Sequence, residues 1–492
     1  MILSLEGLQS PAPWRAAAIT LPTFDIPAMR ALTLASPTWL HFGAGNLFRA
    51  FPCAALQTLL NSGAYDRGVI ACESYDGEII RRAYAPFDNL SLLAVLNADG
   101  RIDKEVIASV ADAIYADEAG IARMAALFAA PSLQMVSFTV TEKAYTKQNP
   151  LMALLAGLLL ARYKTCGAPL ALLSMDNCAH NGAKLRAALL PAVEVLGDAG
   201  FAAYVQEKIS TPNSMIDKIT PHPHPDVAAM LAELGLENSE IFRTEKGTVT
   251  AAFVNAEKAA YLVIEDDFPN GRPPLERAGL IFTDRETVDK AEKMKVGTCL
   301  NPLHTALAVL GCLLGHKKIA DEMADADLLA FVRRLAYVES LPVAENPGVL
   351  SPRAFLDDVI ERRLPNPFLP DTPQRIATDT SQKLSVRFGW TLSHAADPAA
   401  LTCVPFVFAA WLRYLTGVDD SGSPFAPSPD PRMAEVQGRM AEGLTDALLS
   451  DATLFGGDLV ALGLADKVRG YFSQMMRGQG AVREALRGVA EE

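Results

Sequence analysis

The sequence predicts a two-domain chain, in which an α/β domain with a parallel sheet precedes a mainly α-helical domain. Three observations support this fold class. A strand over residues 38–42 runs through a glycine turn into a helix that we expect to end near residue 60. Later apolar strands each end in polar side chains, and from about residue 286 the pattern changes to helices with short connections. We therefore place the domains at residues 1–284 and 285–492, and read the first 36 residues as an N-terminal extension.

The composition is that of a globular protein, because half of the 492 residues are hydrophobic and 21% are charged. A net charge of -13 argues against a nucleic-acid surface. No uninterrupted apolar run reaches membrane-spanning length, and no secretory signal is evident, so we expect a cytoplasmic protein. The seven cysteines form no C-x-x-C pair, which favours reduced thiols and no cysteine zinc site. His222 and His224 alternate with prolines, which favours a rigid loop over a metal site.

The glycine turn after the first strand is typical of phosphate binding in a Rossmann-type dinucleotide domain. Gly43 would permit the tight turn, and Gly45 would let the backbone approach a pyrophosphate. Asn46 would open the helix whose N–H groups face that anion, and Arg49 could reach a phosphate. The usual third glycine is missing, and any strand-to-helix turn can use glycine, so an ordinary turn remains the alternative.

A second strand, residues 68–72, is followed by Glu73. A carboxylate at this point would accept hydrogen bonds from the adenosine ribose and repel a 2′-phosphate, so Glu73 favours NAD over NADP. Two alternatives stay open, since Asp76 could take this role and Glu73 could simply face solvent.

Two more apolar strands, residues 134–140 and 170–174, also end in polar side chains. Thr141 and Glu142 follow the first, and Asn177 follows the second. Ligands of open α/β sheets bind beyond the carboxyl ends of the strands, so we expect these side chains near the bound ligand.

The C-terminal domain opens with Lys295, Asn301 and His304, which come just before and inside the first turn of an apolar helix. Asn301 followed by proline predicts an N-cap, and Gly315 predicts the C-cap. The positive end of this helix would keep His304 neutral, and a desolvated lysine can accept a proton. The structural alternative is a solvated lysine, a capping asparagine and a hydrogen-bonded core histidine.

With these motifs, the chain resembles the long-chain mannitol dehydrogenase family of polyol and hexuronate dehydrogenases over about residues 38–415. The matching blocks are residues 41–49, 139–145, 174–182, 212–217, 295–304 and 365–368. The resemblance implies a Rossmann-type N-terminal domain, an α-helical C-terminal domain and a cleft between them. It also implies NAD(P) chemistry without a metal.

The resemblance assigns roles to individual residues. It implies that Lys295 is the general acid/base and that His304 orients the substrate. Further implied residues are the amide donors Asn301 and Asn177, the polar-network carboxylate Asp217, the basic substrate contacts Arg375 and Lys383, and Phe42 and Ala44 in the cofactor turn. The family usually spaces the lysine and the asparagine five residues apart. Here the spacing is six, which a one-residue bulge could absorb.

We therefore expect a metal-independent, NAD-dependent secondary-alcohol dehydrogenase that interconverts D-fructuronate and D-mannonate, as a monomer or small homo-oligomer. The motive for an acidic substrate is the basic pair Arg375 and Lys383, because a guanidinium binds a carboxylate through two parallel hydrogen bonds. Relatives that act on neutral polyols carry a similar basic pair, so interconversion of D-mannitol and D-fructose is the alternative. A non-catalytic NAD(H)-binding protein is a lesser alternative.

Overall fold

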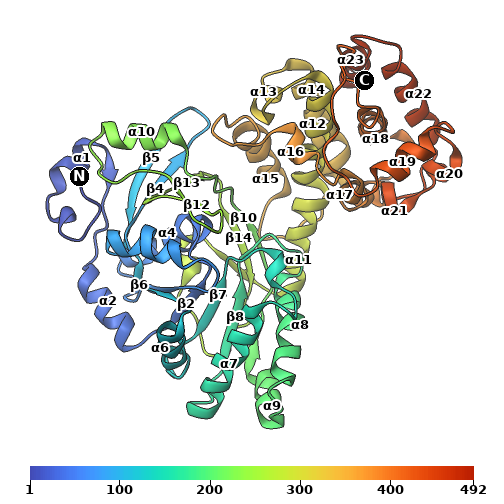
Figure 1. Cartoon of the computed structure of the whole chain (residues 1–492). Helices are drawn as coiled ribbons and strands as arrows, with labels where there is room; N and C mark the ends of the chain where they lie inside the picture. Colours follow the sequence, from blue (N-terminus) through green and yellow to red (C-terminus); the bar gives the residue numbers. More distant parts are fainter. Residues whose placement is uncertain (492) are drawn as a thin grey trace. The chain divides into compact units, whose positions relative to one another are not determined.

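The chain folds into two compact units in the computed structural model, which describes residues 1–491 (Figure 1). The first unit is Met1–Asp289, and the second begins at Lys290. The division falls inside helix α11 (Arg285–Met294), whereas the sequence placed it at the start of that helix.

The first unit is built on a six-stranded sheet in which every neighbouring pair of strands is parallel. Counted along the chain within this sheet, the strand order is 3-2-1-4-5-6, which is the Rossmann order. In spatial order the strands are β6 (Val110–Tyr115), β3 (Val69–Glu73), β2 (Trp39–Phe42), β7 (Met135–Phe138), β8 (Leu170–Ser174) and β9 (Ile209–Ser210). The predicted Rossmann-type domain is confirmed.

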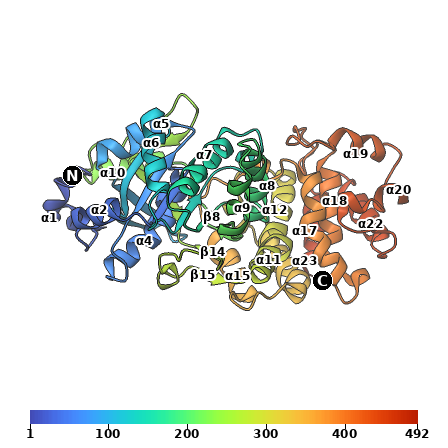
Figure 2. The ribbon, with the colours of Figure 1, turned by 90° about the horizontal axis from the view of Figure 1, so that it is seen from below.

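Helices connect these strands and cover the sheet, which is why β2, β3, β7 and β8 are buried along their whole length. The connecting helices include α4 (Pro52–Asn61), α6 (Glu118–Phe128), α7 (Pro150–Thr165), α8 (Asn181–Glu194) and α9 (Ala199–Lys208). Figures 1 and 2 show α7 and α8 beside β8.

The helix expected after the glycine turn is broken in two. Helix α3 (Asn46–Ala50) ends at Phe51, and α4 starts at Pro52. Proline has no backbone N–H and fits the first position of a helix, so Pro52 begins a new helix instead of continuing α3.

The N-terminal segment is part of the fold, which corrects its reading as an extension. Trp14 in α1 (Pro11–Ala16) is buried, and β1 (Ile19–Thr20) pairs with β5 (Ile102–Ile107) in a second sheet. That sheet has the order β1-β5-β4-β13, where β4 (Ser91–Leu96) and β5 form an antiparallel hairpin and β13 is Phe253–Glu257. Smaller sheets are formed by β10 (Ser214–Asp217), β14 (Tyr261–Glu265) and β15 (Ile281–Thr283), and by β11 (Phe242–Arg243) and β12 (Val249–Thr250).

The second unit is helical, as the sequence predicted. Helix α12 (Asn301–Leu314) is apolar around most of its circumference, and every residue of α18 (Cys403–Tyr414) is buried. Gly315 has a φ of 79° and caps α12, as expected. Helix α17 (Thr380–His394), which packs against α12, was not predicted. The other helices include α13 (Ile319–Met323), α14 (Ala326–Arg334), α15 (Pro352–Asp358), α16 (Pro373–Ile376), α19 (Met433–Met440), α20 (Asp446–Leu449), α21 (Ala452–Phe455), α22 (Ala465–Met475) and α23 (Ala481–Glu491).

One helical stretch, Arg285–Leu314, is long and apolar enough to cross a membrane by length and composition, which the sequence reading missed. Because 83% of its apolar window is buried inside the fold, this stretch has the character of a core helix. All seven cysteines are free thiols, as predicted.

Candidate active site

The glycine turn after β2 is shaped by β7 beside it. Gly43 has a φ of +101°, and a Cβ atom there would lie 2.6 Å from the carbonyl oxygen of Thr139. Position 43 therefore requires glycine both for its backbone conformation and for space. A Cβ at Gly45 would meet no atom within 4 Å, so packing does not explain glycine there, and the space beside it is open to a ligand.

Glu73 is fixed beside this turn at the end of β3. Its carboxylate accepts hydrogen bonds from the backbone N–H of Ala44 at 3.1 Å, of Tyr75 at 2.7 Å and of Asp76 at 3.1 Å. The alternative, Asp76, is buried and accepts hydrogen bonds from the hydroxyl of Thr244 and from that of Thr248. Glu73 is therefore the carboxylate that contacts the glycine turn.

The structure does not support a phosphate contact by Arg49. Its side chain is fully buried, and its guanidinium donates to the carbonyl of Ala251 at 2.8 Å, to the side chain of Asn46 at 3.0 Å and to Thr250 at 2.6 Å. Arg49 thus holds the first helix of the turn against the end of β12. Phe42 is also fully buried, so its backbone alone can approach a ligand.

Asn177 is exposed in the loop after β8, and a buried network around Asp176 holds this loop. Asp176 accepts hydrogen bonds from the hydroxyl of Tyr145, from Ser174 at 2.6 Å and from the N–H of Cys178 at 3.0 Å. Burial raises the pKa of Asp176. The network fixes the backbone on both sides of Asn177.

The other predicted residues of the first unit differ in exposure. Thr141 and Glu142 are exposed after β7, and Glu142 pairs with Lys184 at 2.6 Å. Asp217 is buried as the last residue of β10, where it stands opposite Tyr261 of β14.

In the second unit, Lys295 begins a π turn that leads directly into α12. This turn, Lys295–Cys299, is closed by a hydrogen bond from the N–H of Leu300 to the carbonyl of Lys295 at 3.1 Å. A π turn holds one residue more than an α turn. The extra residue between Lys295 and Asn301 is thus accompanied by a π turn, which is a one-residue insertion of the kind that the spacing suggested.

Lys295 and Lys293 differ in their surroundings, although they are two residues apart. Lys295 is 9% exposed. Lys293 is exposed, and its ammonium lies 5.6 Å from the centre of the Trp390 ring, a cation–π contact. Lys295 is therefore the lysine that is shielded from solvent, and Lys293 is the solvated one.

Asn301 is the first residue of α12, and the N-cap is Leu300, which makes no capping bond. The prediction that Asn301 is the N-cap is therefore wrong. Within residues 1–491, the Asn301 side-chain amide makes no hydrogen bond. Because Asn301 does not cap the helix, its side-chain amide can donate a hydrogen bond to a substrate oxygen.

His304 is neutral, as predicted, but burial is the main cause. The pKa of His304 is lowered to about 4, mainly by burial; Asp371 opposes this shift, and Arg387, Arg363 and Arg375 add to it. The His304 Nε2 atom lies 3.5 Å from Asp371 and makes no hydrogen bond within the described residues.

The two predicted basic contacts already have partners. Arg375 is paired with Asp371, and its side chain is 60% exposed. Lys383 donates to the carbonyl oxygens of Ile376, at 3.1 Å, and Thr378. Burial lowers the pKa of Lys383.

Sequence reasoning missed a third basic residue, Arg387. It lies one turn after Lys383 on α17, and its guanidinium donates to the hydroxyl of Thr305 and, at 3.5 Å, to the carbonyl of Asn301. The four-residue spacing from Lys383 would have placed Arg387 on the same face, had α17 been recognised as a helix.

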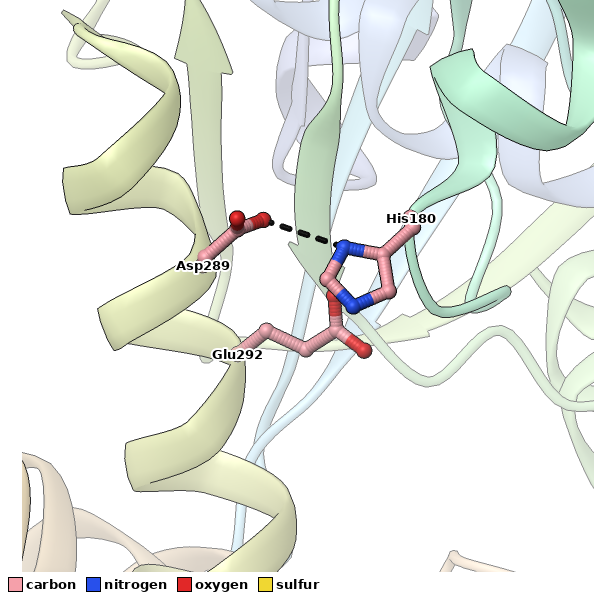
Figure 3. A group of neighbouring side chains, drawn as sticks. All are labelled: His180, Asp289 and Glu292. Carbon is pink, nitrogen blue, oxygen red and sulfur yellow. Dashed lines mark ion pairs between the residues drawn. The ribbon is translucent and has the colours of Figure 1, made fainter.

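A possible metal-binding group lies at α11. His180 Nδ1 is 3.2 Å from Asp289, and Figure 3 also shows Glu292, one turn further along the helix. All three side-chain types bind metals, but His180 is exposed, and exposed acidic groups commonly gather without an ion. Glu292 lies three residues before Lys295 in the sequence.

Comparison with known proteins identifies both parts of the chain. Residues 37–277 match the mannitol dehydrogenase Rossmann domain, and residues 287–475 match the mannitol dehydrogenase C-terminal domain. The chain belongs to the mannitol dehydrogenase family. The glycine turn lies in the first matched region of this family member, and Lys295, Asn301 and His304 lie in the second.

Among curated members of the mannitol dehydrogenase family, a D-mannonate oxidoreductase of Thermotoga maritima is 43% identical over 99% of both chains. A mannitol 2-dehydrogenase of Neosartorya fischeri is 31% identical over 85% of this chain and 86% of its own. Two solved structures match all of both chains. A substrate-free D-sorbitol dehydrogenase has a TM-score of 0.84 at 24% identity, and a Pseudomonas fluorescens mannitol 2-dehydrogenase, in a ternary complex with NAD and D-mannitol, has a TM-score of 0.72 at 25% identity.

Proposed function

We propose that this protein is an NAD-dependent oxidoreductase that interconverts D-fructuronate and D-mannonate. The chemistry rests on one observation, the grouping of a buried lysine, an uncommitted amide and a neutral imidazole at the π turn and first turn of α12. The choice of substrate is supported by the D-mannonate oxidoreductase that is 43% identical over nearly the whole chain.

Each group has a distinct task. In oxidation, Lys295 accepts the proton of the substrate hydroxyl, and in reduction it returns that proton. Asn301 donates a hydrogen bond to the same oxygen as its negative charge develops, and one such donor contributes about 3–4 kcal/mol in well-studied enzymes. His304, held neutral by burial, orients the substrate through a ring nitrogen without adding a charge.

The residues of the first unit fit NAD. Bound NAD would supply the hydride acceptor at its nicotinamide ring. The open space at Gly45, the backbone of residues 42–46 and the carboxylate of Glu73 would hold the dinucleotide, together with Thr141 and Glu142. The similar mannitol 2-dehydrogenase was solved with NAD, which supports this cofactor.

The family resemblance supplies the remaining roles. Asn177 would be a second amide donor, and Asp217 would belong to the polar network around the substrate. Arg375 and Lys383 would contact substrate oxygens through the N–H groups that are not already bonded to Asp371 or to backbone carbonyls. We further propose a cytoplasmic enzyme, a monomer or small homo-oligomer, that acts without nucleic acid, membrane or metal.

The test is kcat/KM for D-fructuronate, D-tagaturonate and D-fructose, measured side by side with NADH. We expect D-fructuronate to give the highest value. If D-fructose gives the highest kcat/KM, the enzyme is a mannitol 2-dehydrogenase-type polyol dehydrogenase. The 31% identical mannitol 2-dehydrogenase supports this alternative. If no substrate oxidises NADH although NADH binds, the protein is a non-catalytic dinucleotide-binding protein.

A further inference from the structure

Arg387 is a cation without an anionic partner. Within residues 1–491 its guanidinium forms no ion pair, and its hydrogen bonds are donated by one nitrogen, Nη1, to Thr305 and Asn301. Its Nε and Nη2 groups make no hydrogen bond to the described residues. Both remain as donors.

The two neighbouring basic residues differ from Arg387 in this respect. The charge of Arg375 is balanced by Asp371, and the ammonium of Lys383 is directed to two backbone carbonyls. Asp379 and Asp430 also act on the charge of Lys383, whereas no described carboxylate acts on Arg387.

Arg387 is half-buried, and burial disfavours a cation that has no anionic partner. Burial lowers its pKa to about 10, and no neighbouring carboxylate offsets this shift. A desolvated cation without a partner opposes folding, whereas a planar guanidinium that meets a carboxylate gains two charge-assisted hydrogen bonds. The arrangement is suited to an anionic ligand.

Arg387 also lies beside the two residues to which we assign substrate binding. Its Nη1 atom is 3.5 Å from the carbonyl of Asn301, and its charge acts on His304. In an extended ketohexuronate, four bonds separate the keto carbon from the carboxyl carbon, a span of about 5 Å. If the keto oxygen binds the Asn301 amide, the substrate carboxylate is therefore close enough for the Arg387 side chain to reach it.

We propose that Arg387 binds the carboxylate of the sugar acid and is the main determinant of acid over polyol. The inference rests on the proposed function, because it assigns the substrate's charged end to a residue of the same site. Arg375 and Lys383 then serve hydroxyl oxygens, which sugar acids and neutral polyols share.

The test uses Arg387→Gln and Arg387→Lys in the full-length enzyme, with Arg375→Gln as the matched control. We measure kcat/KM for D-fructuronate and D-fructose with NADH. We expect Arg387→Gln to lower the value for D-fructuronate by about 10- to 100-fold and the value for D-fructose much less. Arg387→Lys should lower the value for D-fructuronate less, because lysine keeps the positive charge but cannot donate two parallel hydrogen bonds. Arg375→Gln should lower both values to a similar extent.

A binding measurement separates carboxylate recognition from a structural role. Calorimetric titration of the NADH-loaded enzyme compares D-mannonate with uncharged D-mannitol. Arg387→Gln should weaken the binding of D-mannonate and leave the affinity for D-mannitol nearly unchanged. Equal losses for both ligands, or equal losses in both kcat/KM values, would show that Arg387 only supports Asn301 and Thr305, and would overturn the inference.

The two claims can fail separately. The ratio of D-fructuronate to D-fructose in the unmodified enzyme tests the proposed function. The change of that ratio in Arg387→Gln tests the inference. An enzyme that prefers D-fructuronate and keeps its ratio in Arg387→Gln retains its function and refutes the role of Arg387. If Arg387→Gln does not fold, a D-fructuronate-to-D-fructose ratio in Arg387→Lys equal to that of the unmodified enzyme refutes the inference.

Discussion

Lys295 is buried, whereas the lysine two residues before it is exposed, and this difference leads to a prediction. We expect Lys295→Ala to lower kcat by about 10²–10⁴-fold, as loss of a general acid/base does, while NADH affinity stays nearly intact. Lys293→Ala, which removes only the contact with the Trp390 ring, is the control and should retain most activity. Single-turnover kinetics and NADH titration measure the two quantities. An inactive Lys293→Ala variant together with an active Lys295→Ala variant would show that Lys293, and not Lys295, transfers the proton.

Glu322 shows the cost of burying an acid without partners. Its side chain on α13 is fully buried, neither carboxylate oxygen has a hydrogen-bond partner within residues 1–491, and burial raises its pKa well above the usual range. A Cβ at Gly311 of α12 would lie 2.0 Å from one of these oxygens, so Gly311 makes room for the acid.

The pH dependence of stability follows from this raised pKa. A group whose pKa is higher in the folded state stabilises the fold fully below its unfolded pKa, and this contribution is lost as pH rises through the folded pKa. We expect Glu322→Gln to be more stable than the parent at about pH 9 and to differ less at about pH 5. Urea unfolding at the two pH values measures this, with the exposed Glu484→Gln as control. Parallel pH profiles for parent and Glu322→Gln would contradict it.

At the level of elements, the π turn before α12 sets the position of Lys295. Gly297 lies inside this turn, and a Cβ there would be 3.3 Å from the Cβ of Trp390 on α17. We expect Gly297→Val to press the two elements apart and to lower kcat by about 10- to 100-fold, because small displacements of a reacting group are costly. NADH affinity should not change. Gly438→Val is the control, since that exposed helical glycine has no neighbour within 4 Å of its Cβ position, and its kcat should match the parent.

The sequence predicted elements well where local chemistry decides them. The glycine turn, the strand ends and the Gly315 cap follow from rules that act over a few residues. The π turn could be suspected only as an odd spacing, because its existence depends on packing against α17. Helix α17 itself was missed, since its polar face, which carries Lys383 and Arg387, weakens the apolar pattern. The burial of Arg49 was likewise invisible, because its partners Thr250 and Ala251 are about two hundred residues away.

For the whole molecule, the division of tasks follows the two units. The residues that we assign to the dinucleotide lie in the first unit, and Lys295, Asn301 and His304 lie in the second. None of these assignments needs a metal, so we expect activity to be unchanged after prolonged treatment with EDTA. The His180→Ala variant, which removes the histidine from the group at α11, should behave the same way with and without chelator. Activity that EDTA abolishes and zinc restores would contradict the metal-independent mechanism.

Cofactor choice is also a property of the whole first unit, because the strand order brings the end of β3 beside the glycine turn of β2. Glu73 receives three backbone N–H donors there, including that of Ala44 in the turn. A carboxylate has about four acceptor sites, so one remains for a ribose hydroxyl, and its charge repels a 2′-phosphate. We therefore expect the parent enzyme to prefer NADH to NADPH.

Two variants separate the charge of Glu73 from its support of the turn. Glu73→Ser should weaken NADH binding and reduce the discrimination against NADPH. It removes both the negative charge and the carboxylate oxygen that accepts the hydrogen bond of the Ala44 N–H. Glu73→Gln keeps an acceptor oxygen, so it should relax the discrimination with a smaller loss of NADH affinity. Values of kcat/KM for both cofactors at saturating substrate measure these changes. If the parent uses NADH and NADPH equally well, Glu73 serves the turn alone, and the adenosine end of the cofactor is recognised by other residues.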